Sequence, residues 1–309
     1  MPDHPDLRPE PGRAVPVAPD LRRILAPNPS PMTHWGTNTF LIGTGNVAVI
    51  DPGPDNAGHL QAILGALAPE ERITHIFVTH SHLDHSPLAR PLARACGAPV
   101  LGFGPSDAGR SDLMRDLAAQ GGLAGGEGID TAFRPDIALT DGETIDGGDW
   151  SITAIHTPGH MSNHLSFAWR DTVFTGDHVM GWASTLISPP DGDMSQYMAS
   201  LDRLAALGAA RFYPAHGLTV ENPSARLAEL IAHRRGREAA ILAALTRRPG
   251  SAADLAARLY TDTPPALLGA AARNVFAHLL DLSARGLTES KGIPGTESVF
   301  SLSDGHPEM

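Results

Sequence analysis

Residues 79–85 read Thr-His-Ser-His-Leu-Asp-His, and the interpretation of the whole chain depends on this stretch. Four side chains that can ligate a metal ion lie close together in it: His80, His82, Asp84 and His85. The apolar run at 73–78 predicts a strand that leads into them. Because alternate side chains of a strand point to opposite faces, a loop at the strand end is needed to aim several ligands at one point. Ser-Pro at 86–87 is typical of a helix start, with Ser as the cap and Pro in the first turn.

Three more ligands of the same kind are expected at the ends of later strands. His160 closes a Thr-Pro-Gly-His turn, Asp177 follows a glycine, and His216 lies in a Pro-Ala-His-Gly turn. Each turn comes directly after a strand-like segment, where functional residues gather on an α/β scaffold. Together the side chains supply two three-residue clusters and one bridging carboxylate. Imidazole and carboxylate groups without a thiolate suit Zn²⁺, and also Fe or Mn.

The order of these residues resembles the metallo-β-lactamase-fold hydrolases over about residues 20–235. The resemblance is carried by the His-x-His-x-Asp-His pattern, in order with the Thr-Pro-Gly-His and Gly-Asp turns. Asn-Pro-Ser-Pro at 28–31 and Gly-Thr-Asn-Thr-Phe-Leu-Ile-Gly at 36–43 further resemble the lactamase-beta-2-like, glyoxalase-II-related branch. That branch carries a C-terminal winged-helix-like domain. One departure is Ser-Pro at 86–87, where many relatives have two glycines, and it removes no ligand.

The resemblance implies an α/β fold, an αββα sandwich with the metals at one edge of its two sheets. Carried over by position, metal 1 would be held by His80, His82 and His160, metal 2 by Asp84, His85 and His216, with Asp177 bridging them. The expected cofactors are two divalent metal ions, Zn²⁺ first and Fe or Mn as alternatives. Two cations that share a hydroxide lower its pKa towards neutrality, which supplies a nucleophile without a covalent intermediate. Asp84 is the expected catalytic residue, since it could both ligate and orient that hydroxide.

The rest of the first two thirds predicts alternating strands and helices around this site. Residues 1–20 have little apolar periodicity and are expected to form a flexible tail. Residues 103–130 contain two glycine pairs and are expected to be an exposed insertion. A helix is expected from 194, capped by Asp193. The predicted strands are 39–42, 46–50, 73–78, 98–101, 133–139, 150–155, 164–169, 172–175 and 211–214.

From about residue 222 the pattern changes to helices followed by a hairpin. The expected helices cover 223–248, a segment starting at 251, and 264–286, and the hairpin strands are 287–289 and 298–302. Three helices and a hairpin are typical of a small winged-helix-like unit. The expected domains are therefore 21–235 for the hydrolase and 236–309 for the winged-helix-like unit.

Composition restricts the compartment and the partners. A net charge of −11 with His neutral disfavours broad attraction to nucleic acid or anionic membrane. The single cysteine, Cys96, excludes an intrachain disulfide, which agrees with a reducing cytoplasm. The N-terminus lacks the basic and apolar regions of a signal peptide, and no apolar run approaches the roughly 18 residues of a membrane helix. We therefore expect a soluble, cytoplasmic protein with no membrane partner.

Metal ligands specify the reactive water and leave the substrate open, so three functions are weighed. The first is hydrolysis of a thioester or related acyl compound, either a small molecule or carrier-bound, as in glyoxalase-II-like proteins. The second is a single-strand-specific endoribonuclease or other phosphodiesterase with RNA as partner, which the basic cluster at 233–237 would favour. The third is a nucleic-acid-binding regulator that uses the winged-helix-like domain. Its expected recognition helix has only Arg273 and Arg285 as basic residues, which suits packing on the hydrolase domain or on another subunit, as in a homodimer.

Some residues near the ligands invite a stronger interpretation than we give them. His156 and His178 are expected to pack or to support ligands, not to bind metal. Asp51 is expected either to hydrogen-bond a ligand histidine or to serve the turn before Pro-Gly. The substrate groove is expected between residues 103–130 and 179–192. An apolar slot there would favour an acyl chain, and an arginine-lined channel would favour RNA.

Overall fold

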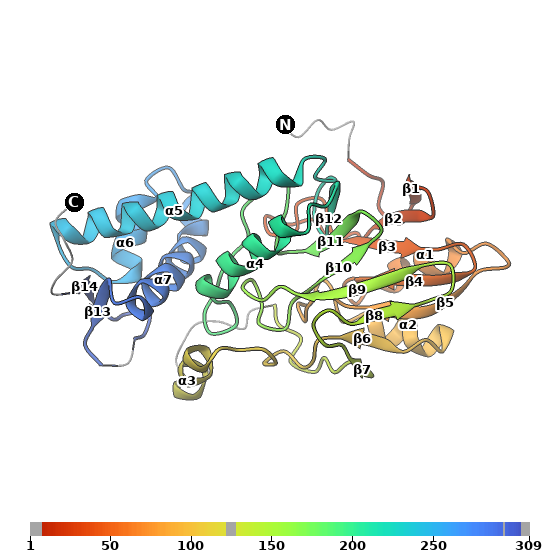
Figure 1. Cartoon of the computed structure of the whole chain (residues 1–309), viewed down its shortest axis with the longest axis horizontal. Helices are drawn as coiled ribbons and strands as arrows, with labels where there is room; N and C mark the ends of the chain where they lie inside the picture. Colours follow the sequence, from red (N-terminus) through yellow and green to blue (C-terminus); the bar gives the residue numbers. More distant parts are fainter. Residues whose placement is uncertain (1–7, 122–127, 293, 304–309) are drawn as a thin grey trace.

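The computed structural model describes residues 8–121, 128–292 and 294–303. Two β-sheets lie face to face with helices outside them, and a helical unit follows at one end (Figure 1). The first sheet has seven strands in chain order, antiparallel from β1 to β4 and parallel from β4 to β7. Its strands are β1 Ala14–Ala18, β2 Leu21–Leu25, β3 Asn38–Ile42, β4 Asn46–Ile50, β5 Arg72–Phe77, β6 Val100–Gly102 and β7 Ile137–Ala138.

The second sheet has five strands in the order β12-β11-β10-β9-β8. Only the β11–β12 pair is parallel. Its strands are β8 Thr144–Asp146, β9 Ser151–His156, β10 Leu165–Trp169, β11 Thr172–Gly176 and β12 Arg211–Pro214. The helices of this part of the chain are α1 Ala57–Gly65, α2 Ala89–Cys96, α3 Asp112–Gln120 and α4 Met194–Ala206.

Burial on both faces of the strands produces the layered architecture. In β4, Ala48 and Ile50 join the core between the sheets, while Val47 and Val49 pack outward with α1 and α2. Phe167 and Phe174 of the second sheet complete the inner core. The outer face of that sheet is covered by α4 and the first half of the next helix. The observed order of layers is therefore αββα, which confirms the expected fold class.

The long helix α5, Pro223–Arg247, joins the sandwich to the C-terminal unit (Figure 1). Its first half contributes Leu227 and Leu230 to the core beside α4, and its second half contributes Ile241 and Leu245 to the terminal core. The expected domain boundary at 235/236 falls inside this helix. The terminal unit continues with α6 Ala252–Leu259, the 3₁₀ turn η2 Pro265–Leu267, α7 Leu268–Ala284, β13 Thr288–Ser290 and β14 Phe300–Leu302.

Three expectations about segments were wrong where the structure describes them. The supposed flexible tail, 1–20, contains β1, which pairs with β2, while residues 1–7 lie outside the described part. The supposed exposed insertion, 103–130, contains α3, whose Met114 and Leu117 are buried in the terminal core, while residues 122–127 lie outside the described part. The strand expected over 133–139 is reduced to β7 because Phe133 packs as a loop residue.

Helix ends follow local sequence signals. Asp193 accepts a hydrogen bond from the Gln196 backbone, which confirms the predicted cap of α4. Asn222 caps α5 in the same way. The start expected at Ser86 was wrong, because α2 begins at Ala89 and Ser86 Oγ instead donates to Asp130 Oδ2 at 2.8 Å.

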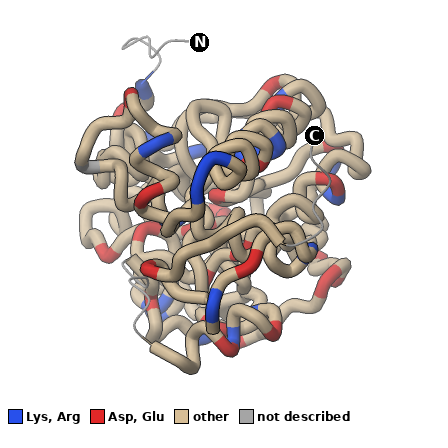
Figure 2. Tube along the Cα trace, turned by 90° about the vertical axis from the view of Figure 1, so that its left-hand side faces the viewer, with Lys and Arg blue, Asp and Glu red and all other residues tan. Residues whose placement is uncertain are grey.

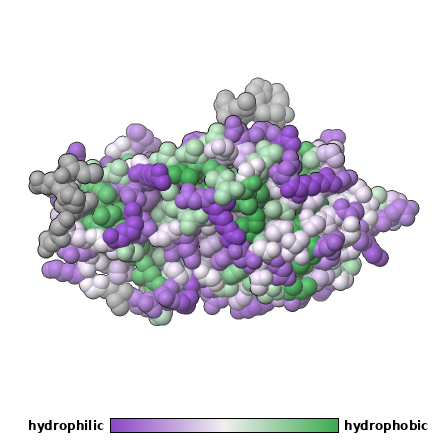
Figure 3. Space-filling view, in the orientation of Figure 1, coloured by the Kyte–Doolittle hydropathy of each residue, from purple (hydrophilic) through white to green (hydrophobic). Residues whose placement is uncertain are grey.

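Most large apolar side chains are buried in these cores and do not form broad exposed surfaces. The face seen in Figure 3 is largely hydrophilic, with apolar residues in separate patches. Within 8–121, 128–292 and 294–303, no helix is both long enough and apolar enough to cross a bilayer.

Candidate metal centre

The predicted loop begins where β5 ends, and all seven expected ligands lie together there. Four side chains from this loop and one from each later turn form two groups. His80 and His82 belong to the first group, and Asp84 and His85 belong to the second. The groups are His80, His82, His160 and Asp177, and then Asp84, His85 and His216. Within each group the potential ligand atoms lie within 4.8 Å of one another.

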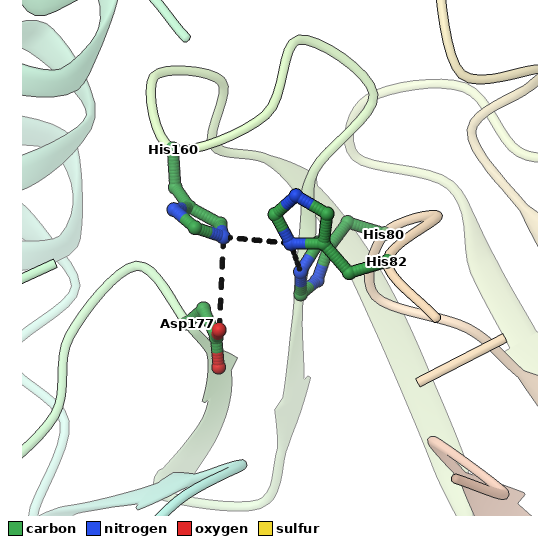
Figure 4. Close-up of side chains that lie close together, drawn as sticks. All are labelled: His80, His82, His160 and Asp177. Carbon is green, nitrogen blue, oxygen red and sulfur yellow. Dashed lines mark hydrogen bonds and ion pairs between the residues drawn. The ribbon is translucent and has the colours of Figure 1, made fainter. Parts of the chain in front are cut away.

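In the first group, three imidazole nitrogens converge on one point (Figure 4). His82 Nδ1 lies 2.9 Å from His80 Nε2 and 3.1 Å from His160 Nε2. Asp177 Oδ2 lies 3.6 Å from the same nitrogen of His160. The converging atoms leave each ring with its other nitrogen directed elsewhere.

In the second group, Asp84 Oδ2 lies 3.3 Å from His85 Nε2 and 3.2 Å from His216 Nε2. Asp177 Oδ1 lies 3.6 Å and 3.2 Å from those two nitrogens. Asp177 therefore turns one carboxylate oxygen towards each group. This is the geometry that a bridging ligand requires.

The outward nitrogens of the histidines are held by groups that sequence reasoning did not single out, apart from Asp51. His80 Nδ1 lies 2.9 Å from Thr79 Oγ1, and His216 Nδ1 lies 3.1 Å from the Gly36 carbonyl. His85 Nδ1 lies 3.0 Å from Asp51 Oδ2, which confirms one of the two expected roles of Asp51. Such outer partners fix the orientation and tautomer of a metal-binding imidazole. Backbone carbonyls and a threonine carry no sequence signal for this role.

The electrostatics differ between the two groups. Burial, and then the neighbouring histidines, hold the pKa of His80 well below its usual value, and burial lowers the pKa of His82 to about 3. A lowered pKa favours the neutral ring, which is the form of an imidazole that can donate a lone pair to a metal ion. Although burial opposes it, the carboxylates of Asp177 and Asp84 raise the pKa of His216 to about 10. The pKa of His85 is also held well above its usual value by Asp84, Asp177 and Asp51, against the effect of burial.

The donor set fits divalent cations. Among the described residues, three buried atoms that face the shared space make only ion-pair contacts with one another or with Asp84 and no well-formed hydrogen bond: His85 Nε2, His216 Nε2 and Asp177 Oδ1. Buried polar atoms are normally satisfied, so unsatisfied atoms pointing at one another indicate a ligand. Nitrogen and carboxylate donors without sulfur suit Zn²⁺, Fe and Mn.

The neighbouring histidines lie outside the two groups, as expected. His156 Nε2 lies 2.9 Å from the Ser162 carbonyl, and its ring stacks on Phe103. His178 is buried beside Tyr197, and burial lowers its pKa to about 3. His164, which we did not predict, packs beside His80 with its Nδ1 2.9 Å from Thr157 Oγ1.

The turn that carries His160 depends on a glycine. Gly159 has φ of +142°, and a Cβ there would lie 2.3 Å from the Cα of Tyr197 in α4. The turn can therefore approach the helix backbone only with glycine at this position. This close approach places His160 beside the loop that follows β5.

A cavity of about 500 Å³ opens onto both groups. As expected, residues 103–130 and 179–192 contribute to its wall. The C-terminal unit contributes as well, which sequence analysis did not anticipate. The lining includes Met32, Ile129, Met161, Met180, Trp182, Leu186, Tyr260, Leu267, Ala270, Ala271, Arg273 and Asn274.

Comparison with known proteins agrees with this geometry. The family model described as the metallo-beta-lactamase superfamily matches residues 32–216, and that of the beta-lactamase-associated winged helix domain matches 251–296. The chain belongs to the metallo-beta-lactamase superfamily. It is thus a superfamily hydrolase with a His/Asp cluster suited to metal, followed by a winged-helix domain.

Proteins with a similar sequence occur in animals and fungi. The "Beta-lactamase-like protein 2 homolog" of Drosophila melanogaster is 33% identical over 276 residues, covering 85% of this chain and 88% of that protein. The "Atrochrysone carboxyl ACP thioesterase" of Aspergillus fumigatus is 29% identical over 236 residues, covering 74% of this chain and 66% of that protein.

Solved structures show the same fold over most of the chain. A beta-lactamase domain protein from Burkholderia ambifaria has a TM-score of 0.78 at 20% identity, covering 97% of each chain. A metallo-beta-lactamase family protein from Thermus thermophilus has a TM-score of 0.73 at 23% identity, covering 93% of this chain and 100% of that one.

Proposed function

We propose that this superfamily hydrolase cleaves a thioester or related acyl compound, either a small molecule or carrier-bound. The observation that carries the proposal is the cavity: away from the proposed ligands, aliphatic and aromatic side chains line much of its described wall, beside several Ser and Thr residues, Asp191 and one arginine, Arg273. Such a wall suits an apolar acyl group. The thioesterase activity in the name of the Aspergillus relative supports the same substrate class.

The proposed cofactors are two divalent ions, with Zn²⁺ as the first candidate. When bound, they lower the pKa of a water molecule and polarise the acyl carbonyl. His80, His82 and His160 would hold one ion and Asp84, His85 and His216 the other, with Asp177 between them.

Asp84 is the proposed catalytic residue. Its side chain is 25% exposed, against 11% for Asp177, and it lines the cavity. Oδ2 faces His85 and His216, while Oδ1 has no hydrogen-bond partner in the described part of the chain. We assign to Oδ1 the orientation of the attacking water or hydroxide.

The RNA and regulator alternatives receive less support. The basic cluster at 233–237 does not form one continuous basic surface: His233 and Arg235 are exposed, but Arg234 is buried and the Arg237 guanidinium stacks on Tyr260. Arg285, directly after α7, is paired with Glu238 and Asp281. From the end that carries the C-terminal helices, acidic and basic positions are interspersed (Figure 2).

The test is hydrolysis of a thioester panel by protein loaded with Zn²⁺, Fe or Mn. Glutathione, CoA and phosphopantetheine-carrier thioesters would be compared with single-stranded RNA. We expect turnover on at least one thioester class and a loss of about 10²-fold or more in kcat for Asp84→Ala. Absence of turnover on every thioester, with cleavage of RNA, would contradict the proposal.

A further inference from the structure

Residues 180–187 form an irregular segment between the C-terminal helices and the metal centre. The segment contributes Met180, Trp182 and Leu186 to the cavity wall. It also holds His160, whose Nδ1 lies 2.8 Å from the Leu186 carbonyl and 2.9 Å from Thr185 Oγ1. Because this segment is part of no strand or helix, its backbone N–H and C=O groups need hydrogen-bond partners elsewhere.

Side chains of α5 and α7 supply those hydrogen bonds. Arg226 Nε donates to the Met180 carbonyl, and Arg226 Nη2 donates to the Ala183 carbonyl, both at 2.7 Å. Arg234 Nη2 donates to the Thr185 carbonyl at 2.5 Å. Asn274 Oδ1 accepts from the Ile187 backbone N–H at 3.0 Å and from Arg234 Nη1 at 3.3 Å.

The burial of Arg234 indicates that it positions the backbone of residues 180–187 and does not only pack against it. Its side chain is 2% exposed and lies over the Tyr197 ring, 5.1 Å from the centroid. Burying a guanidinium is costly, and an apolar residue often stabilises a core equally well. The planar group with its fixed donors can, however, set the position of a carbonyl.

We propose that Arg234 of α5 and Asn274 of α7 are positioning residues for His160, so that the C-terminal unit, through Asn274, helps to set the affinity of the first metal group. The inference rests on the proposed metal binding. Thr185 and Leu186, fixed from behind, hold His160 Nδ1 and thereby leave Nε2 directed at His82 (Figure 4). The winged-helix unit is on this account part of the hydrolase site and not a separate binding module.

The test measures metal affinity and not turnover. Zn²⁺-loaded full-length protein would be titrated with a chromogenic chelator, and the Co²⁺-loaded form would be followed by absorption spectroscopy. For Asn274→Ala we expect one of two ions to bind about tenfold more weakly, the lower end of the effect of losing an outer partner, and the Co²⁺ spectrum to change. Thr185→Val keeps every contact of the helices and is expected to have the same effect, even if Asn274→Ala fails to fold.

Asp281→Asn is the matched control. Asp281 also lies on α7 and contacts Ser195 of α4, but it makes no contact with residues 180–187 among the described residues. We expect its metal affinity to equal that of the wild type. Two bound ions with unchanged affinity in both test variants would overturn this inference alone. A wild-type protein that binds no metal would overturn the proposed function as well.

Discussion

Asp51 shows how one buried residue supports the metal centre without reaching the cavity. Its Oδ1 accepts from the Thr79 backbone N–H at 2.7 Å, and its Oδ2 accepts from Thr79 Oγ1 at 2.8 Å. The same Oδ2 lies 3.0 Å from His85 Nδ1. One carboxylate therefore fixes the start of the ligand loop and the ring of a ligand.

Replacing Asp51 with Asn should weaken both functions. The amide nitrogen cannot accept a hydrogen bond, so at least one of these donors loses its acceptor. We expect about 1–3 kcal/mol lower unfolding free energy and about 10–100-fold weaker metal binding, measured by urea denaturation and chelator competition. Asp136→Asn is the control, because Asp136 accepts from the Val100 backbone but contacts no proposed ligand. Unchanged metal affinity in Asp51→Asn would disprove this role.

Because His278 on α7 is buried, we predict that the stability of the fold falls at acidic pH, independently of metal binding. His278 is 2% exposed, both ring nitrogens lack hydrogen bonds within the described residues, and burial, then Arg234, His233, Arg285 and Arg237, lower its pKa to about 3. In the unfolded chain its pKa is near 6.5. Below pH 6.5 only the unfolded state takes up the proton, so stability falls as the pH falls towards 3.

The variant His278→Leu should therefore lose part of this pH dependence. At pH 7.5 the histidine is neutral in both states, so the acid effect is absent there. Between pH 7.5 and pH 5.0 the variant should lose about 2 kcal/mol less unfolding free energy than the wild type. Urea denaturation at both pH values measures the difference. If the unfolding free energy changed equally with pH in His278→Leu and in the wild type, His278 would not contribute to the acid sensitivity.

At the scale of elements, α3 joins two distant parts of the chain. Its Met114 and Leu117 are buried with Val275 and Phe276 of α7. The segment that follows β6 is thereby fastened to the C-terminal unit.

Truncating Leu117 should loosen that connection. Leu117→Ala removes a fully buried side chain and is expected to cost about 2–5 kcal/mol. Thermal denaturation of the metal-loaded protein measures the effect, and Leu113→Ala, which is only partly buried, should cost less. A loss below that of Leu113→Ala would show that the α3 contact is not part of the stable core.

Elements with strong local signals could be predicted, and those defined by distant partners could not. The Asp193 cap and the apolar stripe of α4 were sufficient to place that helix. The apolar positions of α3 were present, but the glycines after it suggested a loop and its partner lies in α7. Pro16 concealed β1, although an edge strand tolerates proline.

The whole molecule explains why the ligands were predictable and their supports were not. The seven proposed ligands have residue types and spacing that are typical of a metal centre. Apart from Asp51, which precedes a Pro-Gly turn at a strand end, their supports are threonines, backbone carbonyls and an arginine on α5, and residues of these kinds occur everywhere. The contribution of the C-terminal unit to the cavity follows from the path of α5, which no local pattern reveals.

The two-ion site is the central claim for the whole molecule, and metal stoichiometry tests it most directly. Full-length protein would be loaded with Zn²⁺, dialysed and measured by inductively coupled plasma mass spectrometry, beside His82→Ala and His85→Ala. We predict about two ions per wild-type chain and about one for each variant, because each variant lacks a ligand of a different group. A wild-type chain that retains no metal, or variants that each keep two ions, would contradict the account.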